Sequence, residues 1–265
     1  MIAAGDPAIW NSLSPLAIGM SSALKEWRQY VSMTRRIILW DIDGTLITTG
    51  VIGRRALEGG AAEAAGIDTV PEVSMGGKTD PQIIAEILAA SGVPDRLITG
   101  LVPKAVATAQ ILLAQGRSRM VAEGRVHPGV RNVLERLDAI GGVRQSLLTG
   151  NVGANAFVKV ETFGLAGFFD FAVGAYGDDD ANRDNLVPIA LDRVARLRDE
   201  RYSLSEVWIV GDTANDLRCA RAGGVRCLLV GTGKEGLDSL SDLSPDFLLP
   251  DLSDTETVLA ALLGT

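Results

Sequence analysis

The apolar run Ile37-Ile38-Leu39-Trp40 leads directly into the acidic segment Asp41-Ile42-Asp43-Gly44-Thr45. Such a run is typical of a strand buried on both faces, as in a parallel sheet. Side chains two positions apart on an extended chain point the same way, so Asp41 and Asp43 are predicted to lie together at the carboxyl end of this strand. An ordinary Asp-Gly-Thr turn would have the same sequence, and the rest of the chain must decide between the two interpretations.

Strand-like and helix-like segments alternate from residue 36 onward. This alternation predicts an α/β fold with a Rossmann-like, doubly wound parallel sheet core. The strands are expected at residues 37–40, 144–148, 171–173, 207–210 and 226–230, with a weaker one at 247–249. Helices are expected at residues 130–137, 154–163, 187–198, 214–222 and 255–263.

A long stretch between the first two predicted strands has helical patterns at residues 54–65, 81–90 and 101–115 but no convincing strand. A crossover between parallel strands needs only one helix, so this stretch is predicted to be an inserted α-helical cap subdomain. We expect residues 51–125 to form the cap, and residues 35–50 and 126–265 the catalytic core. Residues 1–34 are expected to be an N-terminal extension outside both.

Composition restricts the partners. A net charge of -8 and a pI near 4.8 argue against nucleic acid or an anionic membrane as the main partner. The two cysteines, Cys219 and Cys227, lack metal-type spacing and are predicted to be reduced, as in a cytoplasmic protein. His127 is the single histidine, which excludes a multi-histidine metal site. We expect a monomer or homodimer that binds a small molecule.

Polar residues also follow two later strands. Thr149-Gly150-Asn151 opens a predicted helix, where a hydroxyl and backbone amides could bind an anion, although a plain helix cap would look the same. Asp212 and Asp216 follow residues 207–210, where they could cap a helix and lie in its first turn. Four acids at one edge of a sheet would repel each other without a cation. Oxygen ligands of this kind favour Mg²⁺.

The ordered motifs resemble those of the haloacid dehalogenase-like (HAD) superfamily. They are Asp41-Ile42-Asp43-Gly44-Thr45, Thr149-Gly150-Asn151, a later basic residue, and Gly211-Asp212-Thr213-Ala214-Asn215-Asp216. The resemblance extends from residue 36 to the C-terminus, and the insert resembles the helical cap of the phosphoglycolate phosphatase and β-phosphoglucomutase branch. It implies an Asp41 nucleophile that forms an aspartyl-phosphate and an Asp43 general acid and base.

The same resemblance implies the remaining ligands. Mg²⁺ would be held by the Asp41 carboxylate, the Asp43 backbone carbonyl and Asp212, with Asp216 in support. Thr149 would hydrogen-bond the phosphoryl group, with Gly150 and Asn151 beside it.

The basic residue of the third motif is usually a lysine in this superfamily. This chain has Asn182-Arg183-Asp184-Asn185, and Arg183 is our choice because it keeps the charge and can bind phosphate oxygens, although a surface loop residue would look similar. Lys159 is in the middle of a predicted helix and is less well placed. In the cap, Lys78 lies in a glycine-hinged loop, Gly76-Gly77-Lys78-Thr79-Asp80, from which it could reach the substrate.

The resemblance favours a Mg²⁺-dependent phosphatase that hydrolyses a small phosphorylated metabolite, with phosphoglycolate as a first guess from the branch. A sugar phosphomutase of the β-phosphoglucomutase type has the same core motifs and is the main alternative. A phosphonatase is less favoured because it normally lacks an acid at the position of Asp43. A non-catalytic phosphometabolite-binding protein is also less favoured, because every catalytic position is filled.

Overall fold

The computed structural model describes residues 35–264, so the predicted N-terminal extension lies outside the described residues. The chain forms a five-stranded parallel sheet in the order β4-β1-β5-β6-β7. The strands are β1 (Arg36–Trp40), β4 (Val143–Leu147), β5 (Val207–Gly211), β6 (Arg226–Val230) and β7 (Phe247–Leu249). β1 lies between β4 and β5, so the segments that follow these three strands meet at one edge of the sheet. The predicted α/β core is confirmed.

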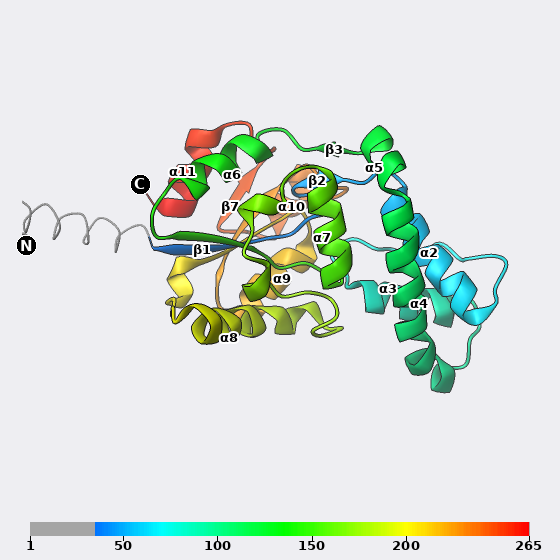
Figure 1. The fold of residues 1–265 in the computed structure, drawn as a ribbon. Coiled ribbons are helices and arrows are strands. Elements are labelled where there is room, and N and C mark those ends of the chain that lie inside the picture. Colours follow the sequence, from blue (N-terminus) through cyan, green and yellow to red (C-terminus); the bar gives the residue numbers. More distant parts are fainter. Residues whose placement is uncertain (1–34, 265) are drawn as a thin grey trace, which may run out of the picture.

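Helices cover both faces of the sheet (Figure 1). Ile38 and Trp40 of β1 pack toward α6 (Val130–Asp138), α7 (Gly153–Thr162) and α11 (Thr255–Leu263). The alternate residues Ile37 and Leu39 pack toward α8 (Leu186–Arg198) and α9 (Ala214–Gly223) on the other face. All four side chains are fully buried, which explains the uninterrupted apolar run. The remaining core elements are α10 (Leu237–Asp242) and the short 3₁₀ helices Ala166–Phe168, Phe171–Val173, Arg183–Asn185 and Leu204–Glu206.

The predicted strand at residues 171–173 is wrong. This segment is a 3₁₀ turn, in which Val173 N donates to Asp170 O and Gly174 N to Phe171 O. Beyond this turn, Ala175 forms an isolated parallel bridge with Leu148. Local turn hydrogen bonds therefore replace the expected ladder, and the apolar residues are buried without forming a strand.

Four helices form the insert at one end of the molecule (Figure 1). They are α2 (Ile52–Ala65), α3 (Asp80–Ala90), α4 (Asp95–Gln115) and α5 (Arg117–Glu123). α4 begins before the predicted residue 101 and continues through Pro103, and α5 was not predicted. α2, α3 and α4 share a cluster of buried side chains separate from those of the sheet. This separate cluster supports the proposal that residues 51–125 form a cap subdomain.

The two segments that connect the cap to the core are paired with each other. β2 (Ile47–Thr48) and β3 (Arg125–Val126) form a short antiparallel ribbon. His127 N donates to Leu46 O directly beside it. The chain therefore enters and leaves the insert at the same place, beside the loop that follows β1.

Helix α4 is the one described helix that is long and apolar enough to cross a membrane by length and composition, with a mean hydropathy of 1.6. A single helix of this kind is weak evidence for a membrane span, and α4 packs on α2 and α3 through buried Ala105 and Ala109. The absence of a membrane partner stays a prediction.

Candidate active site

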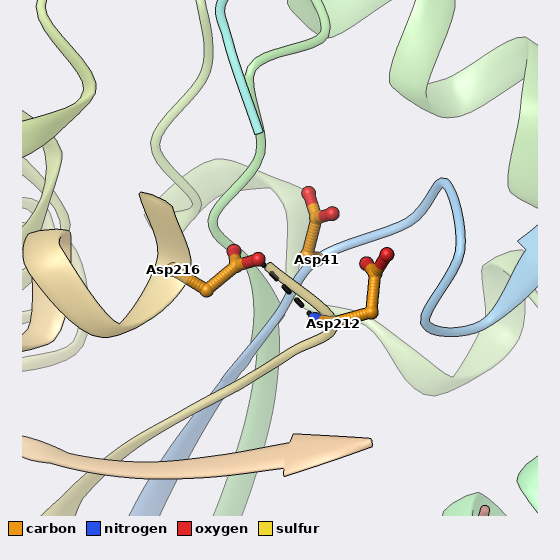
Figure 2. A group of neighbouring side chains, drawn as sticks. All are labelled: Asp41, Asp212 and Asp216. Carbon is orange, nitrogen blue, oxygen red and sulfur yellow. Dashed lines mark hydrogen bonds between the residues drawn. The ribbon is translucent and has the colours of Figure 1, made fainter. Parts of the chain in front are cut away.

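Three buried carboxylates meet at the carboxyl edge of the sheet (Figure 2). Asp41 follows β1, Asp212 follows β5, and Asp216 lies in the first turn of α9. Because β1 and β5 are paired neighbours, the loops that follow them are adjacent. One carboxylate oxygen from each residue lies within 4.8 Å of the other two. This cluster brings together three of the four predicted metal ligands.

Asp216 is fixed by hydrogen bonds at the start of α9. Its Oδ2 atom accepts from Asp212 N at 3.2 Å, from Thr213 N at 3.0 Å and from Thr213 Oγ1 at 2.6 Å. Asp216 N in turn donates to Thr213 Oγ1, which completes a capping box. The cap residue is therefore Thr213 and not Asp212, and Asp216 lies in the first turn of α9 but is fully buried instead of solvated.

Arg183 pairs with two of the three clustered acids. Its Nη2 atom is 3.0 Å from Asp41 Oδ1 and also pairs with Asp216 Oδ1. Although burial opposes the charged form, Asp216 and Asp41 raise the pKa of Arg183 above its usual range. This contact with two buried acids supports the proposal that Arg183 takes the place of the lysine in the third motif. The side chain is 2% exposed, so Arg183 is not the surface residue that we considered as the alternative.

The cluster has more negative charge than Arg183 can balance. Burial raises the pKa of Asp41 to about 6, an effect that Arg183 opposes and that Asp216 and Asp43 add to. Burial, together with Asp216 and Asp41, raises the pKa of Asp212 well above its usual value. Burial is the main cause of both shifts, repulsion between the carboxylates adds to them, and additional positive charge would favour the ionised forms. A divalent cation would supply that charge.

The donor set fits Mg²⁺. All three groups in the cluster present carboxylate oxygens, which this cation prefers. Asp212 Oδ1 accepts from Thr45 Oγ1 at 2.8 Å, whereas Asp212 Oδ2 has no hydrogen-bond partner among residues 35–264. A side chain at Gly44, where φ is +92°, would put its Cβ 2.2 Å from that Oδ2 atom. Glycine therefore keeps the free oxygen of Asp212 accessible.

The side chain of Asp43 lies outside the group of three clustered carboxylates. Its Oδ2 atom accepts from Lys159 Nζ at 2.5 Å and from Asn151 Nδ2 at 2.8 Å. The carboxylate is therefore not a member of the cluster, and only the backbone carbonyl of Asp43 stays a predicted metal ligand. Its side chain is 41% exposed, so it is open to solvent and to a substrate.

Thr149 and Asn151 connect the two aspartates. Asn151 Nδ2 donates to Thr149 Oγ1 at 2.8 Å as well as to Asp43. A hydrogen bond from Thr149 lowers the pKa of Asp41, opposing the effect of burial. The second motif therefore lies beside both Asp41 and Asp43, as the sequence predicts.

The cap loop lies against this second motif. Asp80 N donates to Gly150 O at 2.7 Å, and Asp80 Oδ2 accepts from Val152 N and Asn155 Nδ2, both at 3.0 Å. Burial raises the pKa of Asp80, and these hydrogen bonds oppose the shift. A Cβ at Gly150 would lie 2.0 Å from Lys78 O. Gly150 therefore permits close contact between cap and core.

Lys78 does not contact the carboxylate cluster through its side chain. Its Nζ atom pairs with Glu86 of α3 at 2.5 Å, and both groups are partly exposed. The backbone next to it is nearer the site, since Arg183 Nη1 donates to Gly77 O at 3.3 Å. A contact between Lys78 and a substrate stays a prediction.

Lys159 lies at the site, although its place in the middle of a helix made it the less favoured basic residue. It lies on α7, its side chain is 7% exposed, and it contacts both Asp43 and Asn151 at 2.5 Å. A usable sequence signal was the four-residue spacing of Asn151, Asn155 and Lys159. Such spacing puts polar groups on one face of a helix that begins at the site.

Comparisons with known proteins agree with this geometry. The HAD-hydrolase-like family model matches residues 167–255, which include Arg183, Asp212 and Asp216. The phosphoglycolate phosphatase of Pseudomonas fluorescens (strain Pf0-1) is 26% identical over 222 residues, covering 82% of this chain and 77% of that protein. These matches support an assignment to the HAD-like hydrolase superfamily. The phosphoglycolate phosphatase of Pseudomonas syringae pv. syringae (strain B728a) is 27% identical over 225 residues, with the same coverage.

Solved structures show the same HAD-like fold. A predicted phosphatase from Clostridium acetobutylicum has a TM-score of 0.62 and 15% identity, covering 85% of this chain and 98% of that one. CbbY from Rhodobacter sphaeroides, solved in complex with phosphate, has a TM-score of 0.57 and 20% identity, covering 83% of this chain and 96% of that one. These HAD-like neighbours span the core and the helical insert together.

Proposed function

We propose that this HAD-like hydrolase is a Mg²⁺-dependent phosphatase that hydrolyses a small phosphorylated metabolite through an aspartyl-phosphate on Asp41. The observation that carries the proposal is the cluster of Asp41, Asp212 and Asp216, in which Arg183 pairs with Asp41 and Asp216. The relatives named phosphoglycolate phosphatase support the same reaction class.

The reaction has two displacement steps. An Asp41 oxygen attacks the phosphorus, the bond from phosphorus to the leaving oxygen breaks, and Asp43 gives its proton to that oxygen. Water then attacks the phosphorus of the aspartyl-phosphate and gives a proton to Asp43. The bond from phosphorus to Asp41 breaks, releasing inorganic phosphate and restoring both carboxyl groups to their starting states.

The residues around Asp41 account for how one anion can attack another. Arg183 Nη2 lies beside the attacking carboxylate, where it offsets negative charge. The hydroxyl of Thr149 lowers the pKa of the Asp41 carboxyl, which supports a position beside the nucleophile from which it donates to a phosphoryl oxygen. Bound Mg²⁺, held by Asp41 and Asp212 with Asp216 in support, would stabilise the charge that develops on the phosphoryl group.

The position of the cap loop favours a small substrate. Residues 76–80 lie against the second motif and Arg183, so the loop can cover a ligand bound to Asp41. A closed cover excludes bulk water and leaves room only for a compact leaving group. Phosphoglycolate is the first metabolite to test, because it is the substrate named for the relatives.

Phosphate release tests the proposal. Purified protein would be assayed on p-nitrophenyl phosphate and a panel of small phosphoesters, phosphoglycolate included, with Mg²⁺ and with excess chelator. We expect release that requires Mg²⁺ and is abolished by Asp41→Asn. Folded wild type that releases no phosphate from any ester would contradict the proposal. Phosphoryl transfer between sugar positions without net phosphate release would instead identify a phosphomutase.

A cytoplasmic location is part of the proposal. Both Cys219 and Cys227 are free and buried, which agrees with a reducing compartment. A small soluble phosphoester is the expected partner, and monomer or homodimer stays the expected assembly state.

A further inference from the structure

The two oxygens of the Asp43 carboxylate have different surroundings. Oδ2 accepts from Lys159 Nζ at 2.5 Å and from Asn151 Nδ2 at 2.8 Å. Oδ1 has no hydrogen-bond partner within the described part of the chain, residues 35–264. One oxygen is therefore held by the protein, and the other is left for a substrate or water.

Lys159 is placed to hold Asp43. Its side chain is 7% exposed, and Asp43 is the single carboxylate within ion-pair distance of it among the described residues. A buried ammonium is costly unless it is paired, so the contact fixes both groups. α7 provides a rigid support, since Lys159 lies about two turns after its first residue.

Lys159 also sets the orientation of Asn151. Its ammonium has only donors, so the amide oxygen of Asn151 must face it, and Lys159 Nζ lies 2.5 Å from that oxygen. The amide NH₂ group then faces Asp43 and Thr149, to which it donates. Lys159 therefore acts on Asp43 twice, once directly and once through Asn151.

The first turn of the cap packs over this pair. A Cβ at Gly53 of α2 would lie 3.5 Å from Lys159 Nζ and 2.9 Å from Thr49 Oγ1. The absence of a side chain at Gly53 lets the helix approach the ammonium closely. Lys159 is consequently covered from the cap side while it contacts Asp43 in the core.

We propose that Lys159 is a positioning residue that fixes Asp43 through Oδ2, so that Oδ1 exchanges the proton with the leaving oxygen and with water. This inference rests on the proposed phosphatase function and assigns to it a residue outside the four motifs. Removing the ammonium would let the Asp43 carboxyl group and the Asn151 amide rotate. It would leave Asp41, Arg183 and the metal ligands in place.

Steady-state kinetics of Lys159→Met, Asp43→Asn and the double variant test this role. Met has similar length and no charge. Because general acid–base catalysis contributes about 10²–10⁴-fold, we expect K159M to lower kcat on an alkyl phosphate by about 10- to 100-fold, with KM changed less than about twofold. In the Asp43→Asn background, K159M should lower kcat by less than about twofold, because Lys159 acts through Asp43.

The leaving group gives a second readout. p-Nitrophenolate departs without a proton, so the loss caused by K159M should be smaller on p-nitrophenyl phosphate than on the alkyl ester. If Lys159 had only a structural role, K159M would lower kcat on both substrates by the same factor. It would also lower kcat by that factor in the Asp43→Asn background. Lys104→Met, on the exposed face of α4, is the matched control and should have wild-type kinetics. If K159M does not fold, Lys159→Arg keeps the charge, and its alkyl-ester loss should again exceed its p-nitrophenyl loss.

Distinct outcomes separate the two proposals. Wild type without Mg²⁺-dependent phosphate release contradicts the phosphatase and the role of Lys159 together. An active wild type with K159M equally active contradicts the role of Lys159 alone. A raised KM with unchanged kcat would also overturn it, because Lys159 would then bind the substrate directly.

Discussion

Arg183 Nη2 lies 3.0 Å from Asp41 Oδ1, and the two side chains are 2% and 6% exposed. The same nitrogen pairs with Asp216, which comes from a different strand end. One buried guanidinium therefore joins the proposed nucleophile to the acidic motif after β5. A change at Arg183 is therefore expected to affect both the stability of the fold and the activity of the site.

The variant Arg183→Met should lower both the stability of the protein and its activity. It leaves two buried carboxylates without their cation, so we expect the free energy of unfolding to fall by about 3–5 kcal/mol. We also expect kcat/KM to fall by about 10²-fold or more, because a donor beside the phosphoryl group is lost. Urea unfolding and steady-state kinetics measure the two effects. Arg183→Lys keeps the charge and should lose less of both.

A surface ion pair supplies the control for Arg183→Met. Arg136 pairs with Glu256 at 2.9 Å, and both side chains are well exposed. Arg136→Met should change the free energy of unfolding by less than about 1 kcal/mol and leave activity unchanged. If Arg183→Met were as mild as this control, the assigned role of Arg183 would be wrong.

Mg²⁺ should stabilise the folded protein. Burial, and then the charges of Asp216 and Asp41, raise the pKa of Asp212, and a bound cation would favour its ionised form. At a Mg²⁺ concentration of about 100 times Kd, binding to the native state adds about 2.7 kcal/mol to the free energy of unfolding. Thermal melts over a Mg²⁺ series measure this, and Asp212→Asn should abolish most of the dependence. An equal Tm shift in both proteins would place the cation elsewhere.

A single methyl group at Gly150 should disturb the cap. The added Cβ would lie 2.0 Å from the carbonyl oxygen of Lys78, so Gly150→Ala must push residues 76–80 away from the second motif. Displacing groups by about 1 Å can cost about 10²-fold in rate, and we expect a loss of kcat/KM of this order. Gly100→Ala is the control because no atom lies within 4 Å of its added Cβ. If Gly150→Ala and Gly100→Ala had equal kcat/KM, contact with the cap loop would not be the reason why residue 150 is a glycine.

His127 should make stability depend on pH. Burial, and then Arg125, lower the pKa of His127 below 6.5, so the folded protein favours the neutral ring. The unfolded chain therefore binds more protons as the pH falls below about 6.5, and the free energy of unfolding decreases there. His127→Gln should have a flatter profile between about pH 7 and pH 5 in urea titrations. Identical slopes for wild type and variant would contradict this source of the pH dependence.

The sequence was informative where residues follow strand ends. Asp41 and Asp212 follow apolar runs typical of buried parallel strands, and Thr149 follows the less apolar β4, so their convergence at the carboxyl edge could be predicted. Arg183 required the family pattern, because its 3₁₀ turn has no strong sequence signal. Its burial between two acids depends on tertiary packing.

Other features could not be read from local pattern. The segment 171–173 is apolar enough for a strand, but its backbone bonds are made within a turn. Lys159 resembled a helix-surface lysine because a single residue does not show which face of α7 is buried. The pairing of Lys159 with Asp43 depends on residues 116 positions apart, and such a contact has no local signal.

Phosphate release by wild type and Asp41→Asn tests the central claim most directly. Both proteins would be assayed on p-nitrophenyl phosphate with Mg²⁺ and with chelator, after circular dichroism shows that the variant is folded. The account predicts Mg²⁺-dependent release by wild type and only background release by Asp41→Asn. Undiminished release by the folded variant would contradict Asp41 as the nucleophile and, with it, the aspartyl-phosphate mechanism.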